Sequence, residues 1–193
     1  MTKLLSSVVQ VLGDQLELQE RLRVDRDLVG PFIEEALRLQ SPTKVDFRLA
    51  RKTATLGGVH IPAGTVIMLC LGAANRDPRK FDHPNEFRVD RKNVREHIDF
   101  GRGIHTCAGA PLARVEGHIT INRLLDRTRD LVISEGKHGP PGHRQYLYEP
   151  TFLLRGLTEL HIEFTPGGLT AAPARHRLAR APESVVVTKS APC

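Results

Sequence analysis

The chain has 193 residues, of which 40% are apolar and 5% aromatic with no tryptophan, so it is long enough for one sizeable aliphatic core. Residues 166–193 carry four Lys or Arg against one Glu and supply +3 of the net charge of +6, and the other arginines are scattered, which argues against a nucleic-acid-binding surface. The three cysteines form no C-x-x-C pair and no apolar run is long enough to span a bilayer, so we expect a cytoplasmic protein without a disulfide framework.

The first part of the chain has helical periodicity. Apolar residues three to four apart over residues 4–16 predict an amphipathic helix that is bent or broken at Gly13. A second helical stretch follows at about 17–23. Pro31 suits the first position of a third helix, which should stop at Ser41 because a proline follows.

Strand-like pieces come next. Short apolar runs bounded by glycine and proline predict strands at 45–50, 59–61 and 65–71, which we expect to form a small meander sheet. Two further strands are predicted at 131–134 and 159–164. The predicted fold class is therefore mainly α with small β-sheets (α+β).

A loop and a further helix lie between the two groups of strands. Residues 75–99 are rich in Pro, Asp, Asn and Arg, which predicts an irregular packed loop. Pro111 opens a helix that runs to about Thr128. Its predicted buried side consists of Leu112, Val115, Ile119, Leu124 and Leu125. Residues 166–193 have no periodicity, and we expect a disordered tail there.

The most informative stretch surrounds Cys107. Gly101 and Gly103 permit the positive φ angles of a tight bulged turn, and Gly109 keeps the backbone near the sulfur free of a side chain. The amides at the start of the following helix should point at the sulfur and favour its thiolate by about 0.3 to 2 kcal/mol. A thiolate that is hydrogen-bonded by backbone amides is the proximal ligand that an iron porphyrin needs for oxygen activation, and His105 could reach a propionate of that cofactor.

Two other interpretations of this cysteine stay open. A lone cysteine is often an inert, small apolar residue of the core. A zinc site is a second alternative, although the spacing of its ligands would be irregular. Its candidate ligands are His97, His105, Cys107 and His118.

The stretch from Phe100 to Gly109, Phe-Gly-Arg-Gly-Ile-His-Thr-Cys-Ala-Gly, resembles the signature of the bacterial cytochrome P450 family, Phe-Gly-x-Gly-x-His/Arg-x-Cys-x-Gly, at every fixed position. The resemblance covers most of residues 1–165 and implies the C-terminal, proximal haem-binding part of that fold. It also implies haem b as cofactor, Cys107 as the axial ligand of its iron, and Phe100, Gly101 and Gly109 as parts of the haem-binding loop.

Two further motifs carry the resemblance. Glu35-Ala-Leu-Arg38 matches the family's E-x-x-R pair, which implies a buried structural pair, whereas an isolated Glu and Arg at this spacing usually form a solvated surface pair. The family often adds a third residue to this pair, for which Arg88 and Arg91 are the candidates. The stretch Phe47-Arg48-Leu49-Ala50 is similar to the family's small sheet and implies that Arg48 binds a haem propionate beside His105.

The resemblance implies a haem-thiolate monooxygenase, an oxidoreductase that inserts one oxygen atom from O2 into an organic substrate. Its electrons would come from NAD(P)H through an acidic ferredoxin-type donor that docks on a basic face with Arg102 and Arg114. The family's oxygen-activation pattern, A/G-G-x-D/E-T, does not occur here, so we expect an N-terminally truncated part without the distal half that binds the small organic substrate. The alternative is a non-catalytic remnant or interaction module that keeps the scaffold.

Overall fold

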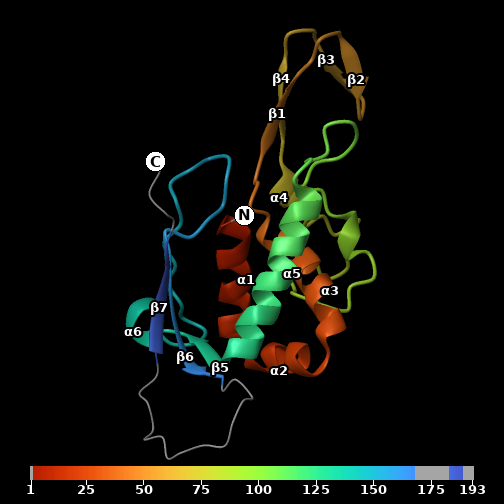
Figure 1. Ribbon diagram of the computed structural model, residues 1–193. Coiled ribbons are helices and arrows are strands. Elements are labelled where there is room, and N and C mark those ends of the chain that lie inside the picture. The colour runs from red at the N-terminus through yellow and green to blue at the C-terminus, as the bar shows by residue number, and fades with distance from the viewer. Residues whose placement is uncertain (1, 168–182, 189–193) are drawn as a thin grey trace, which may run out of the picture.

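The computed structural model describes residues 2–167 and 183–188, with side chains described in the first range (Figure 1). Helices form its centre, two two-stranded antiparallel sheets extend from one end of them, and a three-stranded antiparallel sheet lies beside them. The helices of the N-terminal part are α1 (Thr2–Asp14), α2 (Leu16–Val24), the 3-10 turn η1 (Arg26–Leu28) and α3 (Val29–Gln40). The later helices are α4 (Leu71–Ala74), the 3-10 turn η2 (Val94–Glu96), α5 (Ala110–Arg127) and α6 (Glu135–His138).

The ends of the first helices have local causes. Gly13 lies inside α1, and a Cβ there would come within 2.6 Å of Ile133 Cδ1, so glycine allows the close approach of helix and sheet. The helix is interrupted at Gln15, two residues after the predicted break. Pro31 lies in the first turn of α3 rather than at its first position, and α3 ends where Ser41 adopts a left-handed φ of 39°.

One apolar core joins α1, α2, α3 and α5 to the sheet that follows α5. Val8, Leu12, Phe32, Ile121 and Leu160 are among its fully buried members. The core is mostly aliphatic, as the composition predicted.

The first two sheets are nested hairpins and not the meander that we predicted. Strand β1 (Asp46–Leu49) pairs with β4 (Val66–Leu69), while β2 (Ala54–Leu56) pairs with β3 (Val59–Ile61), and together they extend as an arm away from the helices (Figure 1). Gly57 and Gly58, with φ angles of 57° and 81°, form the two-residue turn of the β2–β3 hairpin. Strand β3 therefore pairs with β2, and β1 pairs with β4 outside this hairpin. Strand β2, with the sequence Ala-Thr-Leu, was not predicted.

The third sheet has the order β5 (Thr128–Ile133), β6 (Glu159–Pro166) and β7 (Glu183–Thr188), all antiparallel. The strands predicted at 131–134 and 159–164 correspond to β5 and β6. Strand β7 lies in the segment where we expected a disordered tail. Residues 168–182 and 189–193 of that segment lie outside the described residues.

The predicted buried face of α5 is wrong in part, because Leu112, Val115 and Ile119 are more than half exposed. The face that packs inward contains Gly117 and Ile121 instead. A Cβ at residue 117 would lie 3.3 Å from Ile33 Cδ1, so α5 contacts α3 through a glycine, which a count of large apolar residues does not detect. None of the described helices has both the length and the apolar character needed to cross a membrane.

Candidate functional site

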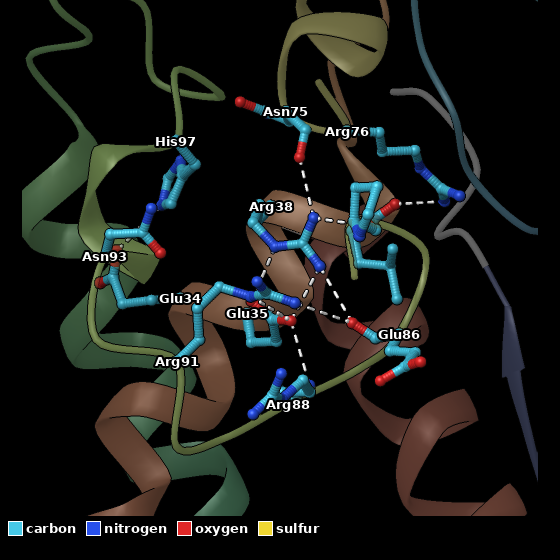
Figure 2. A network of polar contacts seen from close by, with 12 residues as sticks. Glu34, Glu35, Arg38, Asn75, Arg76, Glu86, Arg88, Arg91, Asn93 and His97 are labelled. Atoms are coloured by element: carbon cyan, nitrogen blue, oxygen red, sulfur yellow. Dashed lines mark hydrogen bonds and ion pairs between the residues drawn. The ribbon is translucent and has the colours of Figure 1, made fainter. Parts of the chain in front are cut away.

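Glu35 and Arg38 on α3 form an ion pair with no exposed side-chain surface, so they are not a solvated surface pair. Two parallel hydrogen bonds join them, Arg38 Nε to Glu35 Oε2 and Arg38 Nη2 to Glu35 Oε1, each 2.8 Å long (Figure 2). Of the two arginines left open by the sequence, Arg91 adds its guanidinium, with Nε 3.1 Å from Glu35 Oε1. Arg88 contributes only its backbone N–H to Glu35, and its side chain pairs with Asp90 instead.

This network fixes the irregular loop between α4 and α5 to α3. Arg38 donates to three backbone carbonyl groups of the loop, and Arg91 donates to three as well. The acceptors are Asn75, Asp82, His83, Pro84 and Glu86. Backbone carbonyls in an irregular loop have no strand or helix partners, so two buried arginines satisfy them in place of secondary structure.

The loop that carries Cys107 has the tight turn that its glycines predicted. Gly101 and Gly103 adopt φ angles of 72° and 85°, which other residues rarely reach. The Cys107 N–H donates to the Phe100 carbonyl at 2.9 Å, and both the N–H and the hydroxyl of Thr106 donate to the Gly103 carbonyl. The loop is therefore closed by its own backbone, with Cys107 three residues before α5.

The Cys107 side chain is exposed, so the inert core cysteine is excluded. A Cβ placed on Gly109 would lie 3.7 Å from Cys107 Sγ, with no other heavy atom nearby, so a larger residue would fill the space beside the sulfur. Among residues 2–167 and 183–188, no hydrogen bond to this sulfur is present, and the amide donors that we predicted are not seen. What distinguishes this cysteine is its position on the wall of a pocket.

The pocket has a volume of about 550 Å³ and is bounded by α1, α3, β1 and the cysteine loop. It brings together five of the six residues predicted to bind the cofactor: Arg48, Phe100, Gly101, His105 and Cys107. Gly109 is not in its wall. Apolar side chains cover much of the remainder, among them Leu4, Leu37, Leu71, Leu154 and Leu157.

The sequence did not reveal the role of Asp46. Its carboxylate accepts a hydrogen bond from Arg48 Nη1 at 2.5 Å, and that hydrogen bond holds the pKa of Asp46 below its usual range. Both side chains are about half exposed and line the pocket. The spacing of Asp46 and Arg48 in the sequence could have indicated this pair, because residues two apart on a strand lie on the same face.

Asp99 is a second pocket residue that the sequence did not reveal. Its residue exposure is 7%, and Oδ1 has no hydrogen-bond partner within the described ranges. Burial raises the pKa of its carboxyl to about 7, although a hydrogen bond from the Thr43 backbone opposes that shift. Its neighbours Ile98 and Phe100 give no hint in the sequence that a carboxyl group is buried there.

The zinc alternative receives no support from the positions of its ligands. His97 is buried and bonded to Glu34 and to the Asp99 N–H, whereas His118 is bonded to Asn122 on the outer face of α5. The described part of the chain contains no group of three or more His, Cys, Asp or Glu side chains that could hold a metal ion.

The residues around the pocket fit a planar metalloporphyrin with carboxylate substituents. Cys107 would supply one soft sulfur ligand, Arg48 and His105 would supply groups that bind carboxylates, and the apolar wall suits an aromatic macrocycle. The pocket wall also contains the buried carboxyl of Asp99, whose Oδ1 has no hydrogen-bond partner among the residues that the structure describes, so a bound polar group would satisfy an unmet acceptor there. This set of features is that of the haem-thiolate class.

Comparison with known proteins agrees with that class. Residues 1–151 match the family model of cytochrome P450. The chain belongs to the cytochrome P450 family, whose cofactor is haem.

Several relatives define its place among bacterial members. The chain is 46% identical over 125 residues, 65% of its length, to cytochrome P450 144 of Mycobacterium tuberculosis. It is 38% identical over 161 residues, 83% of its length, to the biotin biosynthesis cytochrome P450 of Bacillus subtilis. Among solved structures, substrate-free cytochrome P450 CYP150A6 of Mycobacterium marinum superposes on 86% of the chain with a TM-score of 0.85 and 60% identity. These alignments span 29%, 38% and 41% of the respective relatives, so the chain covers less than half of each.

Proposed function

We propose that the chain is the proximal, haem-b-binding part of a monooxygenase that inserts one oxygen atom from O2 into an organic substrate. The observation that carries this proposal is that Cys107, His105 and Arg48, which come from a loop and a distant strand, line one pocket. Relatives with related activities support it, since one is named a β-dihydromenaquinone-9 ω-hydroxylase and is 36% identical over 84% of the chain.

Each pocket residue has a role that follows from its chemistry. Cys107 would be the axial iron ligand, and the closed backbone of its loop limits how far the sulfur can move. Arg48 and His105 would bind the propionates, and Arg48 can exchange its exposed contact with Asp46 for a cofactor carboxylate. Phe100, Gly101 and Gly109 shape the loop around the sulfur. Bound haem with a thiolate ligand supplies oxygen activation.

Of the described residues, 45–49 would approach the substrate, because Asp46 and Arg48 of this strand line the pocket. We further propose that the exposed apolar side chains of α5, which are Leu112, Val115 and Ile119, pack against other parts of the cytochrome P450 fold, because isolated apolar faces of this kind mark contact surfaces.

An acidic, ferredoxin-type protein that receives its electrons from NAD(P)H is the proposed electron donor. Arg102 lies exposed in the cysteine loop, next to the ligand that would pass electrons to the iron. Arg114 is less available because it is paired with Glu34. Association should weaken strongly with added salt, and an Arg102→Gln variant should associate more weakly and with a smaller salt dependence. A salt-independent association would rule out this donor.

The central experiment compares Cys107→Ser with Cys70→Ser, since Cys70 is also exposed but lies outside the pocket. Each protein is titrated with haem, reduced, and treated with carbon monoxide. We expect the thiolate-type spectrum from the wild type and from Cys70→Ser, and its loss in Cys107→Ser. An unchanged spectrum in Cys107→Ser would exclude the proposed ligand. A wild-type protein that stays colourless yet unfolds cooperatively would support the non-catalytic alternative.

A further inference from the structure

Glu34 is the immediate neighbour of Glu35 on α3 but belongs to a different set of contacts (Figure 2). Its side chain is 3% exposed. Arg114 donates to it twice, from Nε to Oε1 at 2.5 Å and from Nη2 to Oε2 at 3.1 Å, and His97 Nε2 lies 3.0 Å from Oε2. Burial alone would raise the pKa of Glu34, but hydrogen bonds from His97 and Arg114 lower it to about 2, so the group is a carboxylate at neutral pH.

The two partners of Glu34 lie on either side of the cysteine loop in the sequence. His97 precedes Phe100 by three residues, and Arg114 follows Cys107 by seven residues on α5. The Asp99 N–H donates to His97 Nδ1 at 3.2 Å, which requires the ring proton on Nε2, where it is donated to Glu34. His97 therefore connects the carboxylate to the backbone at the start of the loop.

Phe100 contacts both partners of Glu34, Arg114 and His97, through its ring. The Arg114 guanidinium lies over its ring, 4.8 Å from the centroid, and the His97 ring lies 6.2 Å from it. The carbonyl group of Phe100 accepts the N–H of Cys107. A displacement of Phe100 would thus move the hydrogen bond that places the cysteine.

We propose that Glu34 is a positioning residue for Cys107, which acts by holding both ends of the cysteine loop through His97 and Arg114. We call these three residues the loop clamp. The relevance of the clamp to haem rests on the proposed function, whereas its effect on the loop does not. A carboxylate suits this task because it accepts several hydrogen bonds at once, and hydrogen bonds to a charged acceptor are about twice as strong as neutral ones.

The test measures backbone hydrogen exchange of the full chain by mass spectrometry in peptides that cover residues 98–110. Glu34→Gln keeps the shape of the side chain and removes its charge. We expect exchange in these peptides to become about tenfold faster, while peptides from β5 and β6 change little. Asp126→Asn is the matched control, because it also removes a carboxylate that pairs with an arginine of another element, Arg26 of η1, but at an exposed site at the end of α5 that is far from the loop. It should leave exchange of the loop unchanged.

Arg114→Gln tests the same contact from the other partner, because the Arg114 side chain is 38% exposed and Glu34 keeps its contact with His97 in this variant. Glu34→Asp should restore part of the protection because it keeps the charge. In haem-loaded protein, Glu34→Gln should increase the fraction of the reduced carbon monoxide complex that lacks the thiolate-type spectrum. Unchanged loop exchange in both Glu34→Gln and Arg114→Gln would overturn the proposal, as would uniform acceleration throughout the chain, which would indicate a general structural role. If the wild type fails to bind haem, the proposed function fails, but hydrogen exchange still decides whether the clamp holds the loop.

Discussion

The network of Glu35, Arg38 and Arg91 and the pocket beside Cys107 differ in how their polar groups are satisfied. In the network, charges that are almost completely buried meet each other and backbone carbonyls in short hydrogen bonds. In the pocket, Cys107 is exposed and one Asp99 oxygen has no partner within the described part. The polar groups of the network need no further partner, while those of the pocket can bind a further group. Different residues therefore stabilise the fold and form the binding site.

Arg38→Ala should have the largest effect. It leaves the buried Glu35 with one cationic partner and removes three donors from backbone carbonyls, so we expect a loss of at least about 5 kcal/mol in the free energy of unfolding. Urea unfolding followed by circular dichroism should then show no cooperative transition. A variant that unfolds like the wild type would contradict the structural role of the network.

Arg91→Ala and Arg88→Ala separate the two candidates for the third member. Arg91→Ala should cost roughly 3 to 5 kcal/mol, because it removes a buried guanidinium that touches Glu35. Arg88→Ala removes only an exposed ion pair with Asp90 and should cost about 1 kcal/mol or less. Urea midpoints of the two variants provide the measurement. Equal losses would contradict the assignment of Arg91 as the third member, because Arg88→Ala keeps the backbone N–H that donates to Glu35.

The sequence predicted the cysteine loop better than the surroundings that complete it. Gly101, Gly103 and Cys107 form a local pattern, and local patterns need no knowledge of distant contacts. Residues whose function depends on a distant partner were harder to identify. The choice between Arg88 and Arg91 required the path of an irregular loop, which has no periodicity to guide it.

Dependence on distant contacts also explains which predictions of the fold were wrong. Nested pairing of β1 with β4 is a non-local contact that neither strand indicates by itself. The buried face of α5 contains Gly117, whose contact with α3 depends on the absence of a side chain. The burial of Asp99 could not be predicted from the sequence, because carboxyl groups are seldom buried without a partner.

Asp99→Asn tests whether the buried carboxyl of the pocket, unlike the paired charges of the network, lowers the stability of the haem-free protein. The folded pKa of Asp99 is raised to about 7 above its ordinary value of 3.8, so its ionisation destabilises the fold progressively as the pH rises from about 4 to about 7. In haem-free protein at about pH 8, Asp99→Asn should therefore be more stable than wild type by roughly 2 to 4 kcal/mol, and the gain should shrink towards about pH 5. Urea unfolding at both pH values measures it.

Asp46→Asn is the matched control for Asp99→Asn, because Asp46 lines the same pocket but is exposed and paired with Arg48. It should give no gain at the higher pH. Measurements above about pH 5 avoid interference from Glu34, whose lowered pKa of about 2 means that its contribution is lost only as the pH falls below its ordinary value of 4.5. A pH-independent difference between wild type and Asp99→Asn would show that this carboxyl is not the strained group of the pocket.

Gly101→Ala should have the smallest effect. It tests whether the cysteine loop has its shape before a cofactor binds. A Cβ at residue 101 would approach only the His105 carbonyl oxygen, at an ordinary 3.8 Å, so the cost comes from the φ angle of 72° and should be about 1 to 2 kcal/mol. Gly136→Ala in α6 is the control, because its φ is not positive and nothing lies near its Cβ, so it should be neutral or slightly stabilising. The difference between their urea midpoints measures the conformational cost alone. Equal midpoints would mean that the loop adapts to alanine without loss, and the backbone beside Cys107 would then be formed by the bound cofactor rather than by the glycines.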